Sequence, residues 1–445
     1  MPRDHAPYPG LLDASGRWWS WSRLASSSPT RVVSPGSAEE VASLVREAAR
    51  AGARLKMVGA GHSFTDVATT DGWLLRPDRL VGVRSVDRVA MTVTVLAGTP
   101  LHVMNAALHD LGLALHNMGD VDRQSVAGAI STGTHGTGGR WASLSAQVSA
   151  IEIVTGDGAV RSVSASSDPD LFHAARVGLG ALGIITAVTF MVEPAFTLEA
   201  VEEPTSWDEA VGGFDELVSA NHHVDMYWFP HTDRVLVKRN NRTVDVPRPL
   251  PRARALVEDR FLSNTAFGWL NAVGNAAPSA VPAINRLSSR ALSPRSYSDA
   301  SHRVFVSQRD VVFREMEYAV PRAVGMDALV EARGLIERSG WRISFPVEVR
   351  CAPADDAWLS TAYERDSVYL AFHVNARTDH RAYFSGVEGV MRSYDGRPHW
   401  GKVHTRTAAD LAPAYPRWDD FAAVRARVDP DRLFGNGYLE RVLGA

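Results

Sequence analysis

Cysteine is almost absent from this chain of 445 residues, which contains only Cys351. A single thiol cannot form an intramolecular disulfide, and it cannot supply the several thiolates of a cysteine-based zinc site. Cysteine usage this low is typical of a protein kept in a reducing compartment, so we expect a cytoplasmic location.

The sequence also lacks an uninterrupted apolar stretch of bilayer length, and we predict no transmembrane segment. Neither sign of charge predominates, because 47 lysines and arginines face 50 aspartates and glutamates, for a formal net charge of −3. Such a balance gives no general attraction to nucleic acid, so we expect no nucleic-acid partner. The phosphate-binding loop that ends in Gly-Lys-Ser/Thr is missing, and NTP hydrolysis therefore lacks support.

Histidines at 102, 109 and 116 recur every seven residues. Gly112 should end their helix before the third of them, so we interpret them as surface residues and predict no metal site.

Length and pattern together predict at least two α+β domains, because a single core stops growing at roughly 250 to 300 residues. A helix should begin after Ser37 and end at Gly52. Further helices are predicted at 99–112 and 169–177, and strands at 55–58, 91–97, 151–155, 160–163, 184–192, 224–229, 342–350 and 367–374. Pro194 marks a domain edge. The basic segment 238–257 is interpreted as a solvated connection.

The glycine-rich turn Gly59-Ala60-Gly61-His62-Ser63-Phe64 follows the first predicted strand. Glycines let backbone N–H groups approach a ligand closely, so the turn could bind a pyrophosphate. It could equally reverse the chain and do nothing more.

A second run of small residues, 128–139, has little bulk through twelve positions. A tight crossing of two backbones would leave its Ser and Thr hydroxyls in need of partners. A polar ligand supplies such partners better, and two glycine-rich loops in one domain suit an extended cofactor.

Residues 178–183 match G-x-G-x-x-G, the dinucleotide fingerprint. That fingerprint requires a strand before the glycines and a helix after them. Here a helical segment precedes and a β-branched run follows, so we reject a Rossmann-type NAD site.

Two charged motifs late in the chain are candidates for a reaction site. Glu348 and Arg350 lie two positions apart in a strand pattern and therefore share a face. They form either an exposed ion pair of little energetic value or a guanidinium oriented toward a substrate oxygen. Lys402, after His-Trp-Gly, belongs to a surface turn or points into a pocket, and His373 is a core histidine or a catalytic one.

Taken in order, these motifs resemble those of the aldonolactone oxidases and dehydrogenases, FAD-linked enzymes of the vanillyl-alcohol oxidase class. The motifs that carry the resemblance are 59–64, 117–122, 131–136, 180–183, 348–350, 399–402 and 429–434.

The resemblance implies an α+β fold with a two-lobed FAD-binding domain and an α+β substrate-binding cap domain. The corresponding limits are 1–195 for the FAD-binding domain, 196–414 for the cap domain and 415–445 for a C-terminal segment that returns to the first domain. It also implies that the Gly-Ala-Leu-Gly segment passes near the adenine end of FAD without Rossmann geometry.

The resemblance implies FAD as cofactor, bonded covalently through His62 to the isoalloxazine 8α carbon. The residues expected to bind it are Gly59, Ala60, Gly61, His62, Ser63, Ser125, Gly128, Ser131, Gly133, Thr134, His135, Gly136, Gly183 and Ile185.

For catalysis, the resemblance places Arg350 and Lys402 at the substrate hydroxyl, with Glu348 orienting Arg350 and His373 positioning the substrate. The implied reaction oxidises a secondary hydroxyl of an L-gulono- or D-arabinono-type 1,4-lactone by hydride transfer to flavin N5. The alternative is an alditol oxidase that makes hydrogen peroxide from a polyol. Oxygen and an electron carrier stay open as acceptors, and so does the oligomeric state.

Overall fold

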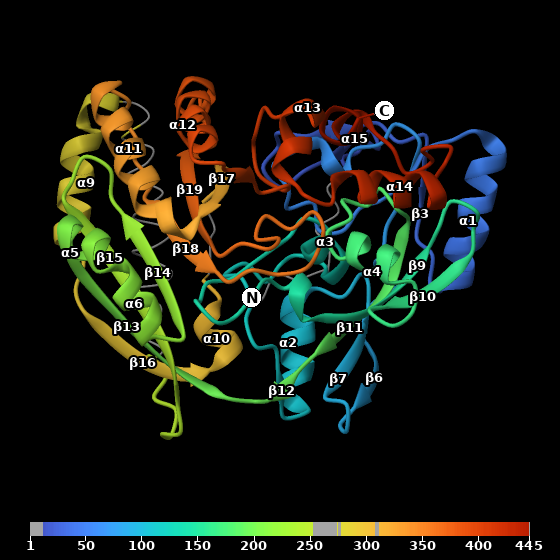
Figure 1. The fold of residues 1–445 in the computed structure, drawn as a ribbon, viewed down its shortest axis with the longest axis horizontal. Coiled ribbons are helices and arrows are strands. Elements are labelled where there is room, and N and C mark those ends of the chain that lie inside the picture. Colours follow the sequence, from blue (N-terminus) through green and yellow to red (C-terminus); the bar gives the residue numbers. More distant parts are fainter. Residues whose placement is uncertain (1–11, 252–273, 275–276, 308–310, 445) are drawn as a thin grey trace.

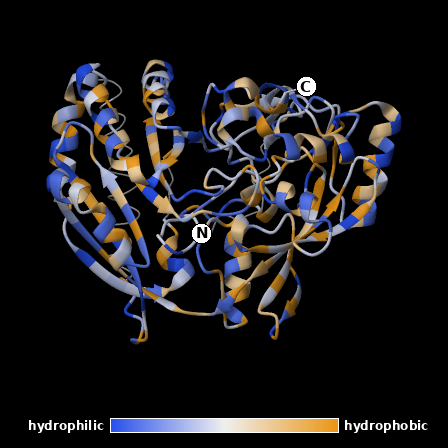
Figure 2. Cartoon of the chain, in the orientation of Figure 1, coloured by the Kyte–Doolittle hydropathy of each residue, from blue (hydrophilic) through white to orange (hydrophobic). Residues whose placement is uncertain are grey.

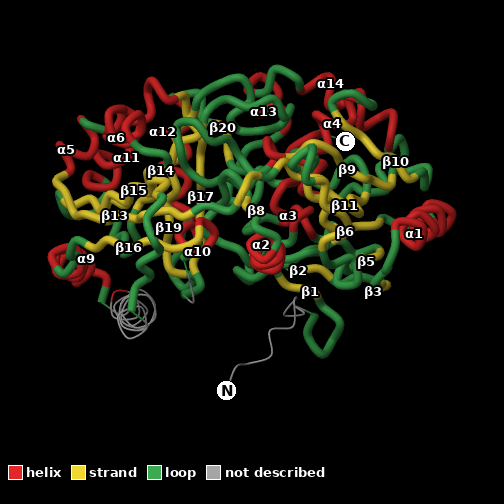
Figure 3. The backbone as a smooth tube through the Cα atoms, turned by 90° about the horizontal axis from the view of Figure 1, so that it is seen from below, coloured by secondary structure: helices red, strands yellow, loops and turns green. Residues whose placement is uncertain are grey.

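The computed structural model describes residues 12–251, 274, 277–307 and 311–444. Two α+β halves lie next to each other in Figure 1, with the cap region at the left and the N-terminal half at the right. Figure 3 shows the same division from below, since the strands of the largest sheet are grouped apart from β3, β5, β6 and β9 to β11.

The N-terminal half contains a parallel sheet of order β3-β5-β4 and an antiparallel sheet of order β10-β9-β11-β7-β6. Two short pairs, β1-β2 and β12-β8, accompany them. The strands are β1 (Trp18–Trp19), β2 (Ser26–Ser27), β3 (Arg31–Val33), β4 (Leu55–Met57), β5 (Trp73–Leu75), β6 (Val83–Asp87), β7 (Thr92–Leu96), β8 (Leu113–Ala114), β9 (Val148–Val154), β10 (Val160–Ser164), β11 (Ile184–Met191) and β12 (Glu193–Pro194). The helices are α1 (Ala38–Ala51), α2 (Leu101–Asp110), α3 (Val126–Ser131) and α4 (Pro169–Ala175).

Local chemistry explains where these elements begin and end. The Ser37 side chain accepts a hydrogen bond from the backbone N–H of Glu40 at the start of α1, and Gly52 ends the helix at φ 62°. In α4, Asp168 caps the first turn and Pro169 occupies the first helical position. The helix and strand predictions for this half are confirmed, and α4 does precede the glycines at 178–183 while β11 follows them.

The cap region is built on one antiparallel sheet of eight strands, ordered β16-β13-β15-β14-β18-β19-β17-β20. These strands are β13 (Thr197–Ser206), β14 (His223–Trp228), β15 (Arg234–Thr243), β16 (Arg295–Ala300), β17 (Phe313–Pro321), β18 (Val347–Ala352), β19 (Ser367–Asn375) and β20 (Arg397–Pro398). The helices are α5 (Trp207–Gly212), α6 (Phe214–Ala220), α9 (Val281–Arg290), α10 (Ser301–Phe305), α11 (Gly325–Arg338) and α12 (Arg381–Ser393).

One face of this sheet is apolar and packs against helices. Met316, Val349 and Phe372 share a buried cluster with Leu329 of α11 and Phe384 of α12. Figure 1 shows α9 and α11 on the side of the sheet far from the N-terminal half, and in Figure 2 these helices carry both hydrophobic and hydrophilic residues. Because side chains alternate along a strand, the residues between the apolar ones face the N-terminal half.

The C-terminal helices pack against the N-terminal half. They are α13 (Ala408–Leu411), α14 (Trp418–Val428) and α15 (Gly437–Leu443). Phe421 and Leu439 belong to the same buried cluster as Val95, Ile130 and Phe172, and Figure 1 shows α14 and α15 beside the N-terminal elements. Leu411, which lies before the proposed boundary at 414, belongs to this core as well, so the division at 195 and 414 stays a proposal.

Two predictions about the cap region were wrong. Residues 238–243 of the basic segment belong to strand β15 and are not a solvated connection; within them Arg239 pairs with Glu203 and Arg242 with Glu193. The strand expected from 342 begins only at Val347, directly after Pro346, which has no N–H to donate to a ladder. Arg252 and Arg254 lie outside the described residues.

Candidate active site

The glycine turn after β4 packs against the start of α3. A Cβ atom on Gly59 would lie 2.0 Å from Ser125 Oγ, and Ser125 caps α3 by accepting a hydrogen bond from the Gly128 N–H. Gly61 adopts φ 68°, in the left-handed region where glycine is favoured. Gly59 is therefore required by the close approach of the two segments, and Gly61 is favoured by its backbone conformation.

An open cavity lies between this turn, α3 and the glycines at 178–183. Ten of the predicted cofactor residues line it: Gly59, Ala60, Gly61, His62, Ser63, Ser125, Gly128, Ser131, Gly183 and Ile185. Two glycine-rich loops that let backbone approach a ligand, together with serine hydroxyls, suit a dinucleotide such as FAD. The predicted residues Gly133, Thr134, His135 and Gly136 do not line the cavity, and their role toward the cofactor stays a prediction.

His62 faces this cavity and stacks on Trp21, with ring centroids 5.7 Å apart. Burial, followed by the positive charges of Lys402 and Arg123, lowers the pKa of His62 to about 4. The imidazole is therefore neutral at pH 7 and keeps a nitrogen lone pair, which a bond to the flavin 8α carbon requires.

At the other end of the cavity is Lys56, a residue that the sequence did not single out. Its Nζ donates hydrogen bonds to the carbonyl oxygens of Leu179 at 3.2 Å, Gly180 at 3.3 Å and Phe434 at 3.3 Å. Burial is the main cause that lowers the pKa of Lys56 to about 7. One ammonium thus ties β4 to the glycine loop and to the C-terminal segment. The feature of the sequence that could have identified Lys56 is the position of a lysine inside an otherwise apolar strand.

The polar face of the cap sheet presents a buried set of charged residues toward the N-terminal half. Strand register puts Glu348 opposite Ala371, which lies opposite Glu317, and it puts His373 opposite Glu315. All four ionisable side chains are at most 5% exposed. Side chains alternate between the two faces along each strand, so the pattern that buries the apolar side chains on one face places these ionisable groups on the opposite face of the cap sheet.

Arg350 lies among three carboxylates in this set. Its Nη2 is 3.1 Å from Asp120 Oδ1 and 2.5 Å from Glu348 Oε1, and its Nε donates to Asp225 Oδ1 at 2.9 Å. Burial alone would lower the pKa of Arg350, but the charges of Asp120, Glu348 and Asp225 raise it well above its usual range. Glu348 thus contacts Arg350 as predicted, in a buried group rather than an exposed ion pair.

Asp225 connects Arg350 to a row of alternating charges that crosses the sheet. Asp225 lies opposite Lys238, Lys238 lies opposite Glu202, and Glu202 lies opposite Arg295. Arg295 Nε donates to Glu202 at 2.7 Å. Opposite charges on directly facing residues stabilise a sheet, and this row fixes the carboxylate that holds Arg350.

Lys402 and His373 share Glu315 as partner. Lys402 Nζ is ion-paired with Glu315 Oε2, and His373 Nε2 lies 3.4 Å from Glu315 Oε1. Although burial raises the pKa of Glu315, Lys402 and His373 hold it well below its usual range. Neither Glu315 nor Glu317 was predicted as a site residue. Their pattern, two carboxylates at alternate positions of an apolar strand, could have identified them.

The turn that carries Lys402 is bound directly to the glycine turn of the cavity. The Phe64 N–H donates to the Gly401 carbonyl at 2.7 Å, and Thr65 Oγ1 donates to the Trp400 carbonyl at 3.3 Å. Lys402 Nζ lies 5.2 Å from the centroid of the Phe64 ring. The structure therefore places this predicted lysine close to the glycine turn, where its charge acts on His62.

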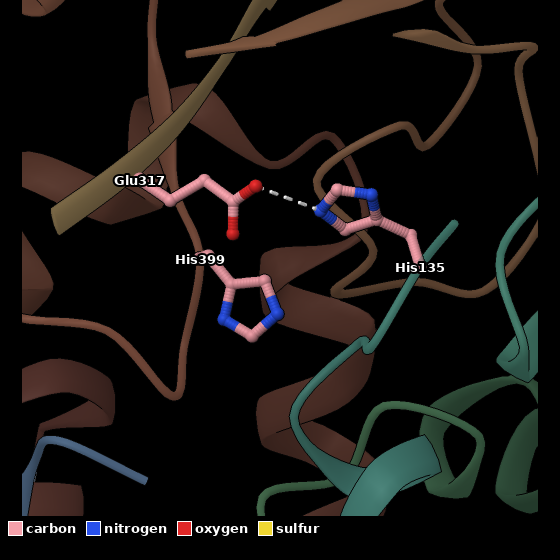
Figure 4. A group of neighbouring side chains, drawn as sticks. All are labelled: His135, Glu317 and His399. Atoms are coloured by element: carbon pink, nitrogen blue, oxygen red, sulfur yellow. Dashed lines mark ion pairs between the residues drawn. The ribbon is translucent and has the colours of Figure 1, made fainter. Parts of the chain in front are cut away.

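His135, Glu317 and His399 form a third buried group, which joins the two halves (Figure 4). His135 Nε2 is 3.2 Å from Glu317 Oε1, and its Nδ1 is 2.8 Å from the Gly136 carbonyl oxygen. Both ring nitrogens of His135 thus lie close to oxygen atoms, one from each half of the molecule. Burial is the main cause that lowers the pKa of His399 to about 3, so that ring is neutral.

The three donor atoms of this group lie within 4.8 Å of one another, a spacing that a metal ion could use. However, His399 Nδ1 accepts the Gly401 N–H at 3.0 Å, which leaves the ring proton on Nε2. Since His135 and Glu317 already pair, we interpret the group as a connection between the halves that also shapes the Lys402 turn.

Within the described parts of the chain, no helix combines the length and the apolar character needed to span a bilayer.

Comparison with known proteins agrees with this geometry. Residues 188–442 match the family described as D-arabinono-1,4-lactone oxidase, and residues 29–164 match the FAD binding domain. An L-gulono-1,4-lactone dehydrogenase from Mycobacterium tuberculosis is 42% identical over 427 residues, which cover 96% of this chain and 99% of that protein. L-gulonolactone oxidase from Bos taurus is 31% identical and covers 96% of this chain and 98% of its own.

An alditol oxidase from a Streptomyces species is 32% identical, covering 95% of this chain and 98% of its own. Among solved structures, a solvent-stable cholesterol oxidase superposes with a TM-score of 0.82 at 18% identity, over 96% of this chain and 97% of its own. That likeness shows the fold alone. The family match and the identity along nearly the whole chain show that this protein is an FAD-dependent oxidoreductase of the D-arabinono-1,4-lactone oxidase family.

Proposed function

We propose that the protein oxidises a secondary hydroxyl of a sugar 1,4-lactone of the L-gulono or D-arabinono type. The observation that carries the proposal is the hydrogen-bonded contact between the Lys402 turn and the glycine turn of the cavity. It brings the cation Lys402, in the turn after β20, close to the glycine turn that contains His62. The names of the relatives from Mycobacterium tuberculosis and Bos taurus support a lactone as substrate.

When bound, the flavin supplies the acceptor for the hydride that leaves the substrate carbon. The residues at 59–63, 125, 128, 131, 183 and 185 would hold the dinucleotide, because they line the cavity. His62 would form the covalent bond, since its neutral imidazole faces the same space.

The cap residues act on the substrate oxygen. As the hydride departs, negative charge develops on that oxygen, and the cations Arg350 and Lys402 stabilise it. Glu348 and Asp225 fix the guanidinium, so its orientation is set before substrate binds. The hydroxyl proton passes to a nitrogen of the Lys402–Glu315–His373 group, since the pKa of its carboxylate, Glu315, is held well below the usual range.

The proposal is tested by anaerobic reduction of the FAD-loaded protein with L-gulono-1,4-lactone, D-arabinono-1,4-lactone and open-chain alditols. Bleaching of the flavin by the lactones supports it, whereas bleaching by alditols alone assigns the alditol oxidase activity instead. Readmitting air, or adding an artificial electron acceptor without air, then shows whether oxygen serves as the acceptor.

Lys402→Met should lower the rate of bleaching by about 100-fold or more, the loss typical of removing one electrostatic stabiliser, while FAD content stays normal. The matched control is Arg377→Met, which removes a cation at the end of β19 outside the site. An unchanged rate in Lys402→Met would remove this residue from the mechanism.

A further inference from the structure

The wall of the cofactor cavity contains one side chain that can supply a positive charge at neutral pH. Among the described residues that line the cavity, only Lys56 is a lysine, arginine, aspartate or glutamate. The histidine of the wall, His62, is neutral because burial lowers its pKa to about 4. FAD is an anion through its pyrophosphate, and a charge attracts an anion more strongly in a partly desolvated cavity than in water. The formal charge that the wall offers to the cofactor therefore comes from Lys56.

The hydrogen bonds of Lys56 require the ammonium form. Its Nζ faces three carbonyl oxygens, those of Leu179 at 3.2 Å, Gly180 at 3.3 Å and Phe434 at 3.3 Å. An ammonium has three N–H donors, whereas a neutral amine has two. Burial is the main cause that lowers the pKa of Lys56 to about 7, so the two forms are close in free energy at neutral pH. An anion in the same cavity favours the ammonium.

Two of the three carbonyls belong to a stretch of unusual backbone in the wall. Leu179 has φ 54° and Gly180 has φ 64°, and both residues line the cavity. The left-handed conformation is unfavourable for leucine, and the bonds to Lys56 stabilise it. The third carbonyl, on Phe434, belongs to the C-terminal segment, where Asp429 Oδ2 accepts the Phe434 N–H at 3.1 Å. Lys56 thus connects the wall of the cavity to the C-terminal segment.

The other ionisable groups that act on Lys56 come from the C-terminal segment. The charge of Arg425, in α14, lowers the pKa of Lys56, and that of Asp429 raises it. Burial is the main cause that lowers the pKa of Arg425 to about 10, so this guanidinium stays charged up to pH 9. Neither β4 nor the loop at 178–183 contains another ionisable side chain.

We infer that Lys56 is a positioning residue for the cofactor and that FAD binds to the protein in which Lys56 is protonated. The ammonium holds the backbone of Leu179 and Gly180 in the wall and supplies the positive charge that the anionic dinucleotide meets. This role concerns the cofactor and does not depend on which sugar the protein oxidises.

The test measures FAD affinity in the His62→Ala background, in which no covalent bond to residue 62 can form. FAD is titrated into the flavin-free protein between pH 6 and pH 9, and binding is followed by flavin fluorescence. The affinity should fall by about tenfold or more over this range, because a protein that must gain a proton to bind its ligand loses affinity above the pKa of that group.

The decisive variant adds Lys56→Met, which keeps an unbranched chain without the ammonium. At pH 6 it should weaken FAD binding by about tenfold or more, the size expected for one charge in a partly desolvated cavity, and its affinity should no longer fall with pH. The matched control is Arg46→Met. It removes a cation of the same half that donates to a backbone carbonyl, that of Gly158 at 2.9 Å, without lining the cavity. This control should leave both the affinity and its pH profile unchanged.

Urea unfolding of each flavin-free protein separates positioning of the cofactor from folding. If Lys56→Met is less stable but binds FAD with the affinity and pH profile of its parent, Lys56 is only a structural tie and the inference is overturned. A parent whose affinity is constant from pH 6 to pH 9 overturns it as well. Should Lys56→Met fail to fold, Lys56→Gln takes its place, and the profile of the parent is decisive without either variant.

Discussion

Gly59 offers a sharp test of the cavity, because its neighbour is defined to the atom. In Gly59→Ala the new methyl group would lie 2.0 Å from Ser125 Oγ and 3.1 Å from Ser125 Cβ. The serine must move, and its cap on α3 is lost. Overpacking costs about 1–3 kcal/mol and a lost cap about 1 kcal/mol, so we expect a destabilisation of about 2–4 kcal/mol.

A double-mutant cycle separates this contact from a general effect. Ser125→Ala alone should cost about 1 kcal/mol, and in the Gly59→Ala background it should cost nothing or restore stability, because the clashing oxygen is gone. Unfolding is followed by fluorescence and FAD content is measured for each variant. Gly389→Ala is the control, since its new methyl group meets no atom within 4 Å. Additive effects of the two substitutions would refute the proposed contact.

Two further predictions concern histidines. His62→Ala should release all its flavin on acid precipitation, whereas wild type retains a yellow, fluorescent band in a denaturing gel; a wild type that also releases all its FAD would contradict covalent attachment. Burial is the main cause that lowers the pKa of His404 to about 3, so the unfolded chain binds the proton first and stability falls as pH drops from about 6.5 toward 3. At pH 5 the loss in free energy of unfolding amounts to about 2 kcal/mol. In urea unfolding, His404→Gln should therefore show a flatter dependence of stability on pH than wild type, whereas the control His173→Gln should not.

Much of the fold was predictable because local signals and tertiary structure agree. The cap at Ser37, the stop at Gly52 and the alternation along β19 are each encoded within a few residues. The strand before Pro346 was mispredicted because apolar alternation continued where a ladder could not. The segment that forms β15 was predicted to be a solvated connection because it is rich in basic residues. Its pairing with β13 makes it a strand instead.

The pairing of Glu348 with Arg350 was predictable because the two residues are neighbours in sequence. Alternation alone put Glu348 and Arg350 on one face, and their contact is observed. The contacts of Arg350 with Asp120 and Asp225 join segments that only the packing of the cap sheet on the N-terminal half brings together. Lys56 was missed for the same reason, since its three carbonyl partners come from two distant segments.

Lysine is used in this chain only where a single point charge is enclosed. The sequence contains just three lysines, and arginine supplies the rest of the 47 basic residues. Lys56 is bonded to three carbonyls, Lys238 donates to the Val304 carbonyl at 3.0 Å, and Lys402 pairs with Glu315. With its side chain 22% exposed, Lys402 is the lysine that an amine-directed reagent meets first. Chemical acylation would therefore report on the proposed reaction site, and protection by a bound sugar could be followed without measuring turnover.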